Sequence, residues 1–169
     1  MILKVLAARI FRATIWHPDA IPAGVDRDAT SAELKRYVLP YFDGVLIVMA
    51  ILAIKLGMPS FDIVLNSEIS SISSWTLLVA SVSAAFGLIF PRFWYLEGAG
   101  KLLMLFVLGG YAAALWTLVF QGVGDRGVVA CAFTALLAFP MWTLWRINRE
   151  RRKQDAQDAV VAAAIAQVS

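Results

Sequence analysis

Two charged residues lie inside an otherwise apolar stretch of this chain, and they are its first candidates for chemistry. Asp43 and Lys55 both fall within residues 37–56. A charged side chain inside the hydrocarbon of a membrane is costly, and by default it marks a proton or ion pathway. Both residues lie close to the ends of the stretch, where a polar side chain reaches the interface. We therefore expect structural roles, with Asp43 as an interface residue and Lys55 as a snorkelling cation.

The expected partners of these charges are the ionic residues nearest to them in the predicted topology. For Asp43 they are Lys35, Arg36 or a cation of the loop after the second stretch, such as Arg92. For Lys55 they are Asp62 and Glu68. Glu97 stands between Arg92 and Lys101, where we expect a surface or interfacial salt bridge. No pair of carboxylates is predicted at a deep position in the membrane, which disfavours a pump or a proton-coupled transporter.

Metal and redox chemistry are restricted because Cys131 is the only cysteine and His17 the only histidine. One thiol makes no intramolecular disulfide, CxxC redox pair or Cys-rich zinc site. One histidine excludes bis-histidine haem ligation and a metal site built from repeated Glu-x-x-His motifs. The phosphate-binding, dinucleotide-binding, HExxH and GxSxG motifs do not occur. We therefore predict a non-catalytic protein with no metal and no cofactor.

The composition indicates an integral membrane protein. Of the 169 residues, 60% are apolar and 16% are charged, whereas soluble domains contain about 45–50% apolar and about 25% charged residues. A soluble domain of ~150 residues buries only about 70% of its surface, so it could not hide this many apolar side chains. The formal net charge of +3 is small and does not indicate a nucleic-acid partner. The predicted partner is therefore the lipid bilayer.

Four apolar stretches are long enough to cross a membrane as helices, which takes about 20 residues each. They are residues 37–56, 72–90, 102–120 and 127–145. The predicted fold is all-α, an integral membrane four-helix bundle. Pro140 should kink the fourth helix, because proline has no N–H to donate. The apolar segment 61–65, between the first two stretches, is expected to lie on the membrane surface.

The distribution of basic residues predicts the orientation of these spans. Thirteen Lys and Arg residues fall on the side of the two termini and of the loop near residue 95, and one falls on the other side. Cytoplasmic loops carry such an excess, so both termini are predicted in the cytoplasm of a bacterial inner membrane. The stop-transfer cations that fix this topology and contact lipid are Arg146, Arg149, Arg151, Arg152 and Lys153.

Two cytoplasmic segments flank the predicted bundle. Residues 1–36 contain an apolar run broken by cations, which indicates a helix in the membrane interface or a helix packed on protein. A capping box at residues 30–33 predicts a helix that leads into the first span. Residues 146–169 begin with the basic cluster and become Ala-rich, which favours a helical tail. That tail either pairs with a second copy or frays in solvent.

Small residues follow the second and third stretches at helical spacing. They are Ser81, Ser83 and Gly87 on the second stretch, and Gly109, Gly110 and Ala113 on the third. Small residues let helices approach closely, which is the main source of packing in lipid. These faces therefore serve packing within the bundle or contact between copies. A pore former should turn polar residues outward, such as Ser81, Ser83, Thr117 or Thr134, whereas a complete bundle should be apolar all round.

The stretch Phe90-Pro91-Arg92-Phe93-Trp94-Tyr95-Leu96-Glu97, followed by Gly100-Lys101, resembles the middle loop of phage holins and of small four-span membrane proteins of phages of actinobacteria. The resemblance covers mainly residues 37–153. It implies a protein that self-associates in the inner membrane and then permeabilises it abruptly, letting an endolysin through. The alternative is a non-catalytic accessory or scaffold subunit of a larger membrane complex, which offers its termini to partners.

Overall fold

The chain is helical throughout the part that the computed structural model describes, which comprises residues 11, 14–16, 37–123 and 126–168. The helices are α3 (Leu39–Leu56), α4 (Pro59–Val64), α5 (Ser67–Ile89), η3 (Pro91–Phe93), α6 (Trp94–Phe120), α7 (Gly127–Leu136) and α8 (Ala138–Val168). Over these residues there is no strand. The prediction of an all-α fold is confirmed.

Four segments are long and apolar enough to cross a membrane: Leu39–Leu56, Ser67–Ile89, Trp94–Phe120 and Gly127–Arg149. They correspond to the predicted spans, but the second and third begin earlier than predicted. α5 begins at Ser67 because Asn66 Oδ1 accepts a hydrogen bond from Ile69 N over 2.8 Å and caps the helix. α6 begins at Trp94, because the charged residues of its first turns find partners inside the bundle.

The fourth span is interrupted as Pro140 predicts. α7 ends at Leu136 and α8 begins at Ala138. Proline has no N–H, so Pro140 leaves the carbonyl of Leu136 without its usual helical donor. At the break, Leu137 N donates to Thr134 O over 3.3 Å, which is a tighter turn than that of an α-helix. Beyond this point α8 continues to Val168, so the last span and the predicted helical tail are a single helix.

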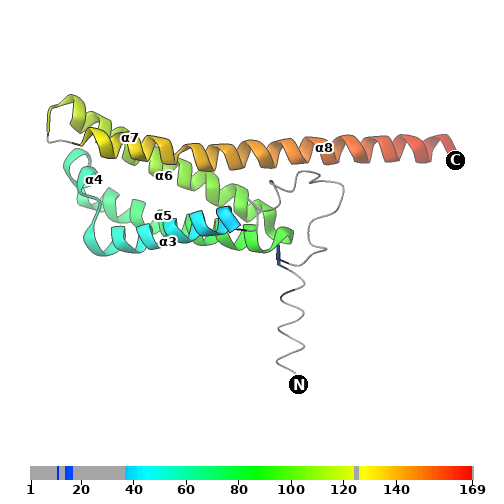
Figure 1. Ribbon diagram of the computed structural model, residues 1–169, viewed down its shortest axis with the longest axis horizontal. Helices are drawn as coiled ribbons and strands as arrows, with labels where there is room; N and C mark the ends of the chain where they lie inside the picture. The colour runs from blue at the N-terminus through cyan, green and yellow to red at the C-terminus, as the bar shows by residue number, and fades with distance from the viewer. Residues whose placement is uncertain (1–10, 12–13, 17–36, 124–125, 169) are drawn as a thin grey trace, which may run out of the picture.

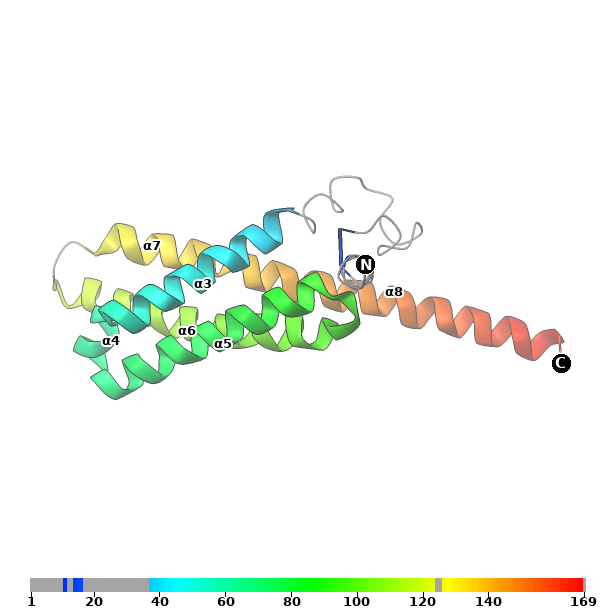
Figure 2. The same cartoon turned by 90° about the horizontal axis from the view of Figure 1, so that it is seen from below.

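The spans are arranged around the α5–α6 pair. α5 and α6 are joined by η3 and run antiparallel, α3 packs on α5, and both α7 and α8 pack on α6 (Figure 1). α4 lies at one end of the bundle, here called the α4 end. α8 leaves the bundle at the opposite end, here called the tail end, and projects beyond it as a single helix (Figures 1 and 2).

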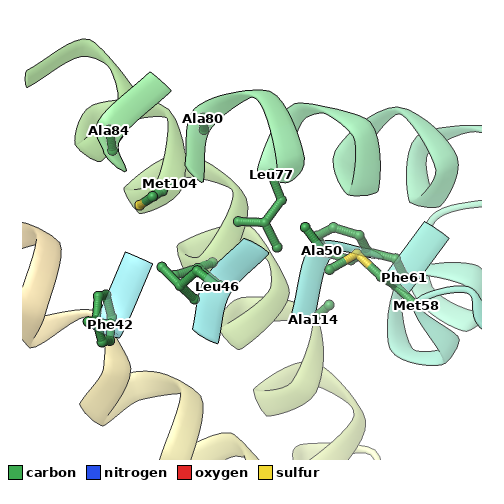
Figure 3. Packing of buried hydrophobic residues seen from close by; sticks show 11 residues of the cluster. Phe42, Leu46, Ala50, Met58, Phe61, Leu77, Ala80, Ala84, Met104 and Ala114 are labelled. Carbon is green, nitrogen blue, oxygen red and sulfur yellow. The ribbon is translucent and has the colours of Figure 1, made fainter. Parts of the chain in front are cut away.

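The core is built from side chains of α3, α5 and α6. Leu46, Leu77 and Met104 gather between these helices, and the small residues Ala80 and Ala84 bring α5 close to its neighbours (Figure 3). Most large apolar side chains instead face outward, as expected where the surrounding solvent is lipid. The interior therefore combines bulky side chains with small residues that let the helices approach closely.

One residue of the segment 61–65, which was predicted to lie on the membrane surface, is instead part of the core. Phe61 of α4 is 3% exposed, and its ring meets the edge of Tyr111 of α6 at a centroid distance of 5.3 Å. Met58, just before α4, is also buried. The short helix folds back because the Gly57–Pro59 turn ends α3 and directs Phe61 toward α6. That prediction is wrong for Phe61, whereas Ile63 and Leu65 are exposed.

Two glycines allow α5 and α6 to approach closely. A Cβ atom on Gly100 of α6 would lie 2.6 Å from Ala80 O and 2.7 Å from Ala84 N of α5. A Cβ atom on Gly87 of α5 would lie 2.3 Å from Glu97 N of α6. Such contacts gain dispersion energy along the helix backbones, which is what holds helices together in lipid. Gly87 therefore serves packing within the bundle.

The described residues of the N-terminal segment contact the tail end of the bundle. Ile15 N donates to Ile89 O over 3.0 Å, and the Ile15 side chain is buried with Leu39 and Leu88. This contact agrees with a segment packed on protein. The rest of the predicted interfacial helix and the capping box at residues 30–33 lie outside the described residues.

We predict that Gly100→Ala destabilises the bundle and that Gly98→Ala does not. Alanine at position 100 collides with the α5 backbone, and overpacking of this kind costs about 1–3 kcal/mol. A Cβ atom on Gly98 meets nothing within 4 Å, so alanine there leaves stability unchanged or raises it by up to about 1 kcal/mol. Thermal unfolding in detergent micelles measures both variants. Equal melting temperatures would contradict the close α5–α6 contact.

Candidate functional site

A buried ion pair connects α3 to α6 near the tail end. Asp43 of α3 and Lys101 of α6 both have 0% of their side chains exposed. Lys101 Nζ donates to Asp43 Oδ1. The same nitrogen lies 5.5 Å from the centroid of the Phe42 ring, whose π face is a further favourable site for a cation. Each charge is thus neutralised inside the bundle instead of at its surface.

The predicted environment of Asp43 is therefore wrong. Asp43 was expected near the interface, paired with Lys35, Arg36 or a cation of the loop after the second stretch, such as Arg92. Arg92 is exposed, and Lys35 and Arg36 lie outside the described residues. The prediction failed because the third span was taken to begin at residue 102, which left Lys101 in a loop. With α6 beginning at Trp94, Lys101 lies well inside the helix and faces α3.

A second ion pair connects α6 to α8. Arg146 Nη2 donates to Glu97 Oε1 over 3.3 Å, and the two side chains are 11% and 9% exposed. The Arg146 guanidinium also lies 5.5 Å from the centroid of the Trp142 ring. Glu97 was expected to pair with Arg92 or Lys101, and its partner is instead on the last span. The expectation missed this pair because residue 146 is far away in sequence.

The two pairs together form the charge network, defined here as Asp43, Lys101, Glu97 and Arg146. Glu97 and Lys101 are four residues apart on α6, so they share one face of that helix. Through them α6 is bound by a salt bridge to α3 and by another to α8. The network contains two acids and two bases, and it therefore introduces no net charge into the span region.

The charge network is better suited to fixing the positions of the helices than to stabilising them strongly. Burying an ion pair costs desolvation energy that the attraction between the charges offsets only when all polar atoms find partners. Asp43 Oδ2 is buried and accepts no hydrogen bond from the described residues. Removing one partner leaves a buried charge, so a shifted register of the helices is strongly disfavoured. In this arrangement Asp43 and Lys101 have no exposed surface that could receive a substrate.

Lys55 lies at the other end of the bundle and is exposed, as a snorkelling cation should be. The expected salt bridge to Asp62 or Glu68 does not form, and all three residues are described. Asp62 is instead close to the turn after α3, where its Oδ2 lies 3.3 Å from the position a Cβ atom would take on Gly57.

The small residues divide between an inner and an outer face. On α5, Ser81 is wholly buried and donates to Leu77 O over 2.7 Å, Gly87 is buried, and Ser83 is half-buried. On α6, Gly110 and Ala113 are exposed, and Gly109 has no atom within 4 Å of a built Cβ. A Cβ atom on Gly110 would lie 3.6 Å from the ring of the core residue Phe61, so Gly110 borders α4. Ser81 and Gly87 therefore serve packing within the bundle, and Gly109 and Ala113 face outward.

Outward polar side chains are satisfied within their own bundle. Thr117 donates to Ala113 O over 2.9 Å, and Thr134 donates to Ala130 O over 2.8 Å and accepts from Trp116 Nε1 over 3.0 Å. These hydroxyls can therefore face hydrocarbon without a large desolvation cost. Of the polar residues expected to face outward in a pore former, Thr117 and Thr134 do so and Ser81 does not.

The basic cluster after the fourth span has several roles. Arg146 belongs to the charge network, and the Arg149 guanidinium lies 5.3 Å from the centroid of the Trp145 ring. Arg152 is exposed, and the side chains of Arg151 and Lys153 lie outside the described part. The cluster therefore includes one cation, Arg146, that joins α8 to α6, whereas Arg149 and Arg152 are exposed.

No metal site is formed by three or more His, Cys, Asp or Glu side chains within the described ranges. Cys131 is exposed on α7. No protein-family model, curated protein or solved structure matches this chain.

The α6 half of the charge network could have been predicted from the sequence. Glu97 and Lys101 have the i, i+4 spacing of an acid and a base on one helix face, and Gly100 next to them marks a close helix contact. With these two features taken into account, the predicted start of the third helix moves from residue 102 back toward Trp94. The partners Asp43 and Arg146 depend on which helices pack together, which the sequence alone does not specify.

We predict that Lys101→Met destabilises the bundle by about 3–5 kcal/mol, because it leaves the buried carboxylate of Asp43 without its partner. The double variant Asp43→Asn, Lys101→Met should recover part of this loss, since neither position then carries a charge. Lys55→Met removes an exposed, unpaired cation and is the matched control. Unfolding in detergent micelles measures all three variants. A Lys101→Met protein as stable as Lys55→Met would contradict the buried pair.

Proposed function

We propose that this small polytopic membrane protein acts by associating with further copies of itself, as a holin-like pore or lesion former of the bacterial inner membrane. The observation that carries the proposal is the outward face of α6, where Gly109, Ala113 and Thr117 follow one another at intervals of one turn. Small residues on a lipid-facing helix let a second helix approach its backbone. The resemblance of residues 90–101 to phage holins supports the same reading.

The contact between copies is assigned to α6 because α5 has no comparable face. Ser81 and Gly87 are buried inside a single bundle, so they are not available to a second copy. Gly109 and Ala113 remain outside it. The hydroxyl of Thr117 is bonded to its own helix, so this face is compatible with lipid before copies meet.

Both termini are proposed to lie in the cytoplasm. Residues 14–16 contact the bundle at the tail end, and α8 leaves the bundle at that same end. The excess of Lys and Arg lies on this side of the chain, and the positive-inside rule then assigns the tail end to the cytoplasm.

Expression in a bacterial inner membrane tests the proposal through the membrane potential over time. We expect an abrupt collapse after a delay, and we expect Ala113→Leu to prevent or greatly delay it, because leucine keeps neighbouring helices apart. Ala132→Leu adds the same bulk to an exposed alanine of α7 and is the matched control. A stable potential at high expression would overturn the proposal, as would equal behaviour of the two leucine variants.

A second candidate is an accessory or scaffold subunit of a larger membrane complex, and the geometry of α8 favours it. This helix has 31 residues and projects alone beyond the tail end. Ala156, Ala159 and Val160 are exposed on the projecting part. These exposed apolar side chains could be covered by a partner.

Deletion of residues 150–169 separates the two candidates. A lesion former that associates through α6 keeps the abrupt loss of potential after this deletion, whereas a scaffold subunit loses its partners. The full-length chain and the truncated chain are compared for both membrane potential and proteins co-purified after crosslinking. Unchanged potential in every variant, together with a partner lost on truncation, would favour the scaffold.

A further inference from the structure

An apolar cavity of about 230 Å³ lies near the α4 end. Its walls come from four spans and from the turn before α4, and they include Leu52, Leu56, Met58, Leu108, Tyr111 and Phe133. α3 packs on α5 while α7 packs on α6, so the cavity lies where α3 and α7 diverge. Leu52 and Leu56 form an open rim, with 49% and 77% of their surfaces exposed.

One wall of the cavity is rigid and aromatic. The Tyr111 ring meets the edge of Phe61 at 5.3 Å and the edge of Phe133 at 4.7 Å, so three rings hold one another in place. The lining offers water almost no hydrogen-bond partners, and apolar cavities of this kind stay dry and take apolar ligands. The cavity is also smaller than the roughly 300–1,000 Å³ of sites for drug-sized molecules. A segment of a single acyl chain fits these conditions.

Hydrocarbon is the solvent at this depth. The lining residues Met49, Leu52, Ala53 and Leu56 belong to the membrane span of α3. An acyl chain gains no hydrophobic energy by moving from lipid into the cavity, so tight packing and its headgroup must provide any selectivity.

Lys55 is the residue that could recognise the headgroup. It does not line the cavity, but it lies in the last turn of α3, next to the rim residue Leu56 and three residues after the rim residue Leu52. It is exposed and unpaired with Asp62 or Glu68, so its ammonium is available to a phosphate at the interface. We infer that this cavity binds one acyl chain of an anionic phospholipid from the leaflet at the α4 end, with the headgroup held by Lys55. The site lies within a single bundle and does not depend on self-association.

Photocrosslinking identifies the occupant. The full chain is reconstituted into vesicles that contain phosphatidylglycerol with a photoactivatable group on its acyl chain, and adducts are mapped by mass spectrometry. We expect adducts concentrated on cavity residues such as Met58, Tyr111 and Phe133. Adducts spread equally over outward residues such as Val48 and Phe106 would overturn the proposal, because they would report ordinary contact with the bilayer.

Variants separate the chain site from the headgroup site. Leu52→Trp fills the rim and should remove most cavity adducts, whereas Val48→Trp, on an exposed position of the same helix, should keep them. Lys55→Gln should lower the preference for phosphatidylglycerol over phosphatidylcholine about fivefold. Arg92→Gln removes an exposed cation at the opposite end and should leave this preference unchanged. Equal preference in the Lys55→Gln and wild-type proteins would overturn the headgroup contact.

A second copy of the chain is the competing occupant. In that case cavity adducts would fall as the ratio of protein to lipid rises, and crosslinks between copies would replace them. Adducts that persist at one copy per nanodisc would support a lipid. The circular dichroism and melting temperature of each variant identify any that fails to fold, and Leu52→Trp lies at an exposed rim where folding tolerates bulk.

Discussion

The close approach of α5 and α6 is the constraint on which the rest of this structure depends. Helices in lipid gain no hydrophobic energy from association, so the contact between their backbones must provide the attraction. Gly100 sits against Ala80 and Ala84, and Gly87 sits against Glu97. Because Gly100 fixes which face of α6 meets α5, the next residue, Lys101, turns toward α3, which packs on the same α5 helix. The position of a buried charge therefore follows from a glycine contact.

The charge network extends this constraint to the whole tail end. Asp43 and Lys101 bind α3 to α6, while Glu97 and Arg146 bind α8 to α6. The rings of Phe42 and Phe139 stack at a centroid distance of 4.5 Å and connect α3 with α8 directly. Ion pairs and aromatic contacts thus join three spans at the end from which α8 projects.

The two ends of the bundle differ in physical character. The tail end is joined by charges, whereas the α4 end has the apolar turn of Met58 and Phe61 and an open cavity beside it. The faces of the spans differ in the same way. Ser81 and Gly87 of α5 pack inside the bundle, whereas Gly109 and Ala113 of α6 lie on its outer surface.

Composition and hydropathy determined the class of this protein and its four spans, because a run of about 20 apolar residues has few options other than crossing a bilayer. Pro140 determined the interruption of the fourth span, since a missing N–H is a local property. The burial of Phe61 and the start of α6 at Trp94 could not be predicted from such local properties. An apolar segment fits a membrane surface and a protein core equally well, and only the position of Tyr111 selects the core. The tertiary structure alone decided that Asp43 pairs with Lys101 and Glu97 with Arg146, because each pair joins helices whose adjacency is set by packing and not by any local preference of the chain.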